Sequence, residues 1–69
     1  MDANYFIDRL KSTLNRYQTA AVLRNRLDNL DDFTRQQIVK ELKKEVLKER
    51  NHDIKQALVE LLFRMPIAS

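Results

Sequence analysis

The chain has 69 residues with no cysteine, no glycine and one proline, and its formal net charge at pH 7 is +3. Disulfides are excluded, and one histidine without cysteine cannot supply the usual ligand set of a structural zinc site. Without glycine the tight turns of β-hairpins are disfavoured, so we expect a single all-α domain over residues 1–69. A core of this size is only marginally sufficient, and oligomerisation is the remaining common device; we therefore expect a homodimer.

Residues 2–27 are predicted to form one long, bent helix. Their apolar residues recur every three or four positions, but in two registers, first Ile7, Leu10, Leu14, Tyr17 and Ala21, then Ala20, Leu23, Leu27 and Leu30. The register changes near Gln18 and Thr19. A break into two shorter helices at that point is the alternative.

Residues 28–33 are the clearest predicted connection, because Asp and Asn side chains bond to nearby backbone amides. Thr34 with Gln37 forms a capping box at the start of the next helix, and Asp31 is a rival cap one turn earlier. This second helix is expected to run to about Arg50.

The second helix has a narrow apolar stripe beside dense charge. The stripe consists of Ile38, Val39, Leu42, Val46 and Leu47. A lysine row and a glutamate row run along the helix at four-residue spacing: Lys40, Lys44 and Lys48, and Glu41, Glu45 and Glu49. We interpret both rows as a solvated face.

A break at Asn51–His52, with Asp53 and Gln56 as a second capping-box pattern, separates the last helix. Its core stripe is Ile54, Leu58, Leu61 and Met65, at helical spacing. The predicted fold is thus a small three-helix bundle. The alternative is a helical hairpin with one continuous helix over residues 34–65, since neither glycine nor proline interrupts that range.

No pattern of a catalytic or cofactor site is present. The hydroxyl residues lie in no nucleophile signature, and the absence of glycine removes the phosphate-binding loops. His52 is expected to lie exposed at a helix junction. We therefore expect no enzyme, no cofactor and no bound metal. No apolar run is long enough to span a membrane, and a cytoplasmic location is the default expectation.

Apolar side chains outside the main stripes predict an interaction surface. Val59 and Phe63 form a second face on the last helix, and Tyr5 lies off the stripe of the first. We expect these three to anchor another protein, with Arg16, Arg24 and Arg64 as the polar rim. In the alternative interpretation Val59 and Phe63 complete the core. The predicted function is a small non-enzymatic regulator or adaptor, acting as a homodimer.

Nucleic-acid binding is the alternative function. The first predicted helix carries five basic residues: Arg9, Lys11, Arg16, Arg24 and Arg26. Guanidinium groups there could contact phosphates, with Gln18 or Asn25 near the bases. The acidic row of the second helix would repel a phosphate backbone laid along it.

Scattered residues resemble the Hha-type modulators of nucleoid proteins. They are Tyr5, Arg9-Leu10, Gln18-Thr19 before a helix, and the helix ending at Pro66. The charged rows over residues 40–49 depart from the more mixed central helix of that family. The resemblance implies a small regulator that binds another protein, and no functional residue is carried over from it.

Overall fold

The computed structural model describes residues 3–65, and every regular element in this range is helical. Four α-helices follow one another, with a 3₁₀ turn at Leu27–Asn29 after the second: α1 (Ala3–Lys11), α2 (Arg16–Asn25), α3 (Asp32–Lys48) and α4 (His52–Arg64). The all-α prediction is confirmed. The number of helices differs from the predicted bundle, because the long first helix is two helices.

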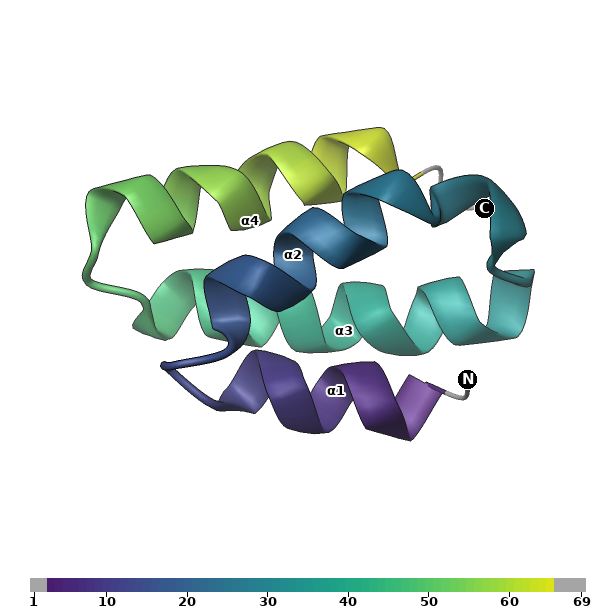
Figure 1. The fold of residues 1–69 in the computed structure, drawn as a ribbon, viewed down its shortest axis with the longest axis horizontal. Helices are drawn as coiled ribbons and strands as arrows, with labels where there is room; N and C mark the ends of the chain where they lie inside the picture. The colour runs from purple at the N-terminus through teal and green to yellow at the C-terminus, as the bar shows by residue number, and fades with distance from the viewer. Residues whose placement is uncertain (1–2, 66–69) are drawn as a thin grey trace.

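The helices form a small bundle in which α3 and α4 lie side by side and run in opposite directions (Figure 1). α1 packs against α3, and α2 packs against both α1 and α4. α1 and α4 therefore lie on opposite sides of the bundle, with α2 and α3 between them (Figure 1). A surface on the outer side of α4 is consequently separate from one formed by α1.

The expected long helix over residues 2–27 is interrupted by a turn at residues 12–15. The amide of Ser12 donates to the Arg9 carbonyl at 3.2 Å, and the amide of Asn15 donates to the Ser12 carbonyl at 3.1 Å. The Asn15 amide group also donates to Ser12 Oγ at 3.3 Å. Ser and Asn side chains that bond locally in this way compete with the hydrogen bonds of a helix, so the helix breaks at residues 12–15. The break therefore lies before Gln18 and Thr19, where the apolar register changes.

The turn decides which apolar register enters the core. Leu14 is 93% exposed and Tyr17 57% exposed, so the first register is wrong beyond Leu10. The second register is confirmed, since Ala20 and Leu23 are buried. The largest fully buried apolar side chains are Phe6, Leu10, Leu23, Ile38, Leu42, Leu58 and Leu61.

The stripes of the last two helices are largely as predicted. Leu58, Leu61 and Met65 are buried, and Ile54 is partly buried. On α3 the prediction is wrong for Leu47, which is 86% exposed. Leu47 follows the buried Leu42 by five positions. At 3.6 residues per turn this spacing is about 1.4 turns, so Leu47 points away from the side that Leu42 buries.

Side-chain caps fix the starts of α3 and α4. Asp31, the rival to Thr34, is the cap of α3, and its Oδ1 accepts the Thr34 amide at 2.8 Å. Asn51 caps α4 in place of Asp53. The break between these helices is confirmed and the continuous helix over residues 34–65 is wrong, because α3 ends at Lys48.

The last helix, α4, ends at Arg64. The proline expected to stop this helix, Pro66, lies outside the described residues. Within residues 3–65, none of the helices is both long and apolar enough to cross a membrane.

Candidate interaction surface

Three of the six predicted contact residues, Val59, Phe63 and Arg64, lie on α4. Leu58 and Leu61 turn the inner side of this helix into the core. Phe63 follows them at a spacing that places it on the outer side, and its side chain is 85% exposed. Val59, one turn earlier on the same side, is partly buried, and Arg64 is exposed. We call Val59, Phe63 and Arg64 the α4 face.

The α4 face stands on a well-anchored helix. Asn51 Oδ1 accepts the amides of Asp53 at 2.9 Å and Ile54 at 3.1 Å, which satisfies two of the unpaired donors at the helix start. At the other end, the Met65 amide donates to the carbonyls of Leu61 and Leu62. Phe63 is thus presented by a helix with both ends bonded.

Arg16 lies in the interior, so the exposed rim position expected for it is wrong. Its residue is only 6% exposed. Nη1 donates to Glu49 Oε1 at 2.6 Å and Nη2 to Glu45 Oε1 at 2.8 Å. Nε donates to the Leu10 carbonyl at 2.8 Å, and Nη2 also reaches the Lys11 carbonyl at 3.4 Å. The planar guanidinium has several donors in a fixed geometry, so it can bond two carboxylates and two carbonyls at once. The single ammonium group of a lysine could not do so.

This guanidinium joins the end of α1 to the end of α3. The carbonyls of Leu10 and Lys11 belong to the last turn of α1, where orphan acceptors and the helix dipole favour a positive charge. Glu45 and Glu49 lie in the last turn of α3 and directly after it. Arg16, the first residue of α2 after the turn, therefore links the end of α1 to the end of α3.

The solvated-face interpretation is wrong for the glutamate row and holds for the lysine row. Glu41, Glu45 and Glu49 are buried, at 6%, 2% and 9% exposure. The three lysines of the neighbouring row, Lys40, Lys44 and Lys48, are exposed. The glutamate row faces inward because it accompanies the apolar stripe and meets a cation there.

The environment shifts the two carboxyls paired with Arg16 in opposite directions. Burial raises the pKa of Glu45, and the neighbouring Glu41 carboxyl raises it further, against the lowering effect of Arg16. Glu45 Oε2 has no hydrogen-bond partner within residues 3–65. The pKa of Glu49 is lowered by the Asn51 amide, which donates to Oε2 at 3.0 Å, and by Arg16.

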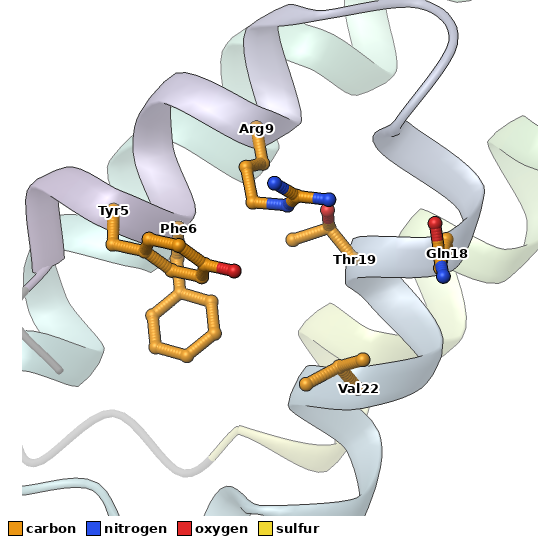
Figure 2. A pocket seen from close by; sticks show the side chains of 6 residues that line it. All are labelled: Tyr5, Phe6, Arg9, Gln18, Thr19 and Val22. Carbon is orange, nitrogen blue, oxygen red and sulfur yellow. The ribbon is translucent and has the colours of Figure 1, made fainter.

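Tyr5 lies on α1, outside the α4 face, in a groove between α1 and α2 (Figure 2). The groove is lined by Tyr5, Phe6, Arg9, Gln18, Thr19 and Val22. The rings of Tyr5 and Phe6 meet edge to face, with centroids 5.3 Å apart. Tyr5 is 44% exposed and lies on α1, which packs against α2 and α3.

Arg24 lies on the α2 side of an open hollow between α2 and α4. The hollow is lined by Tyr17, Arg24, His52, Asp53, Gln56, Ala57 and Glu60. Arg24 Nη1 is 3.9 Å from Glu60 Oε2, and both side chains are half exposed, so the pair adds about 0–1 kcal/mol to stability. His52 is exposed at the helix junction, as expected. Within residues 3–65, no three His, Asp or Glu side chains form a group that could hold a metal ion.

The residues that sequence reasoning missed are those of the interior charge cluster. Their only sequence signal is the four-residue spacing of Glu41, Glu45 and Glu49, and this spacing is equally typical of a solvated face. The groove between α1 and α2 was not predicted either. Its one sequence signal is that Tyr5 and Arg9 stand one helical turn apart, where their side chains can meet.

Comparison of the chain with protein-family models, with curated proteins and with solved structures found no match. The resemblance to the Hha-type modulators rests only on the scattered residues named above, from Tyr5 to Pro66.

Proposed function

We propose that the chain is a small non-enzymatic regulator or adaptor that binds another protein through the α4 face, and that it does so as a homodimer. Phe63 is the anchor, Val59 extends the apolar contact by one turn, and Arg64 stands beside them as the polar rim. A rigid helix face of this kind fits a groove or a second helix.

The observation that carries this proposal is the exposure of Phe63. A phenylalanine that completed the core would be largely buried, as Phe6 is at 1%, whereas Phe63 is 85% exposed. The core interpretation thus fails for Phe63 in the single chain. A large aromatic side chain left in water on a capped helix is typical of an interface anchor.

The homodimer is tested by the molar mass in solution, measured by light scattering over a range of concentrations. We expect the mass to rise with concentration from the 8.2 kDa of one chain to twice that value. Phe63→Ala should remain monomeric over the same range, while Leu14→Ala, which removes an equally exposed apolar side chain from the turn at residues 12–15, should behave as wild type. A wild-type chain that stays monomeric throughout would contradict the homodimer.

The second candidate is a basic helical regulator of DNA or RNA. It is supported by the exposed side chains of Lys11, Arg24 and Arg26 on or next to the first two helices. It is weakened by the burial of Arg16, whose guanidinium forms ion pairs with Glu45 and Glu49 and is not exposed to a phosphate. A steep fall of nucleic-acid affinity with rising salt would support this candidate, and no binding at low salt would contradict it.

A further inference from the structure

The groove between α1 and α2 has the size and polarity of a small binding site. Its volume is about 140 Å³. That is close to the ~150 Å³ of an engineered apolar cavity that holds a benzene ring in another protein. The groove has apolar walls from Phe6 on α1 and Val22 on α2, and its polar groups are gathered around Arg9, Gln18 and Thr19 (Figure 2).

Arg9 brings a positive charge to this groove without an acidic partner in the described chain. Within residues 3–65 its guanidinium forms no ion pair, and it lies over the Tyr5 ring, 5.4 Å from the centroid. Contact with the face of an aromatic ring holds a guanidinium in place while leaving its donors available. An anionic group in the groove would meet a positioned cation.

Thr19 adds a second, independent feature. It is only 3% exposed, and its Oγ1 is buried without a hydrogen-bond partner in the described part of the chain. A threonine in a helix commonly bonds to a carbonyl one turn back, here that of Asn15, and this hydroxyl does not. Its oxygen points from α2 toward Arg9 (Figure 2). A buried hydroxyl left unpaired is costly, so a ligand acceptor beside Arg9 would gain from it as well.

We propose that this groove binds a small aromatic carboxylate. The ring fits between Phe6 and Val22, where the edge-to-face pair of Tyr5 and Phe6 supplies an aromatic wall. The carboxylate forms an ion pair with the guanidinium of Arg9 and accepts a hydrogen bond from the hydroxyl of Thr19. The groove is lined by residues of α1 and α2 and by none of the α4 face, so the proposal requires neither a partner protein nor a dimer.

The test uses benzoate as the probe, titrated into the full chain and followed by backbone amide chemical shifts. We expect saturable shifts centred on residues 5–9 and 18–22, with a dissociation constant on the order of millimolar, as befits so small a ligand. Arg9→Gln should weaken binding at least about tenfold, because a charge-assisted contact is lost. Arg24→Gln removes a matched charge from α2 outside the groove and should leave the affinity unchanged.

Two further measurements separate the charge from the shape of the site. Benzamide, the neutral analogue, should bind at least about tenfold more weakly than benzoate. Val22→Trp should fill the groove and abolish the shifts, and circular dichroism would verify that this variant at a partly exposed position remains helical. The proposal is overturned by shifts located outside the groove, by no saturable shifts at all, by equal binding of benzamide, or by an unchanged affinity in Arg9→Gln.

Discussion

Arg16 Nη1 lies 2.6 Å from Glu49 Oε1, although 33 positions separate the two residues in the chain. The same guanidinium holds Glu45 and two carbonyls at the end of α1, and all three side chains are buried. A cluster of opposite charges thus lies in the interior, although the sequence predicts a solvated glutamate row and an exposed Arg16. It ties the turn at residues 12–15 to the end of α3.

Removing the cation should therefore destabilise the fold strongly. Arg16→Ala leaves two buried carboxylates without their partner, for which we expect a loss of about 3–5 kcal/mol in the free energy of unfolding. Arg16→Lys should also lose stability, since one ammonium cannot serve both carboxylates and both carbonyls. Urea unfolding followed by circular dichroism measures the change. Arg24→Ala is the control, because its exposed pair with Glu60 predicts a loss of at most about 1 kcal/mol. Equal losses in both alanine variants would refute the structural role of Arg16.

The two carboxyls around Arg16 predict opposite contributions to the pH dependence of stability. Glu49 has a pKa below its ordinary value of 4.5, so its stabilising effect is complete above that value and is lost as the pH falls through the lowered pKa. Glu45 has a pKa raised above 4.5, so the charge on it costs stability increasingly as the pH rises through the range above that value.

Single amide substitutions separate these contributions. Glu49→Gln should lower stability at neutral pH and lessen the further loss on acidification. Glu45→Gln should flatten the fall in stability that occurs above pH 4.5. The measurement is the free energy of unfolding from neutral pH down to about pH 3. Identical pH profiles for wild type and Glu49→Gln would contradict the assignment of the acid-sensitive contact.

The start of α4 depends on one amide side chain. Asn51→Ala removes the acceptor for two backbone amides, and we expect a loss of about 1 kcal/mol. Asn51→Asp should retain most of the stability, because Asp is an equally good cap. His52→Ala, at the next and exposed position, is the control for an unrelated side-chain loss. Thermal unfolding would show the ranking, and a loss in Asn51→Asp as large as in Asn51→Ala would argue against the cap.

Two phenylalanines should respond differently to truncation. Phe63→Ala should change the free energy of unfolding by no more than about 0.5 kcal/mol, because the side chain is 85% exposed. Phe6→Ala should cost about 3–5 kcal/mol, since it empties a fully buried site. Urea unfolding at low protein concentration measures both without a contribution from association. A large loss in Phe63→Ala under these conditions would place Phe63 in the fold and remove it from the interface.

The sequence predicts those features that depend on nearby residues. The stripe of Leu58, Leu61 and Met65 is repeated at helical spacing, and the break after α3 follows from a polar run with its own caps. The break after α1 was not predicted at its true position, because Leu14 continues an apparent apolar stripe across the turn. Local spacing cannot tell which of two registers the core selects.

The sequence predicts the exposed Phe63 but not the buried charge cluster around Arg16. Phe63 stands out because it shares no stripe with the core residues of its own helix. Arg16 and its glutamates resemble surface residues when each helix is considered alone. Their burial depends on the return of α3 past the end of α1, which is a tertiary relationship that composition and spacing do not encode.

Photo-cross-linking from position 63 tests most directly whether the α4 face is an interface. A photoreactive phenylalanine analogue there should give a discrete cross-linked species in cells, with its mass and composition showing whether the partner is a second copy or another protein. The same analogue at exposed Lys43 on α3 is the matched control and should give no such species. We expect a cross-link from position 63 alone. No cross-link there, or the same pattern from both positions, would contradict it.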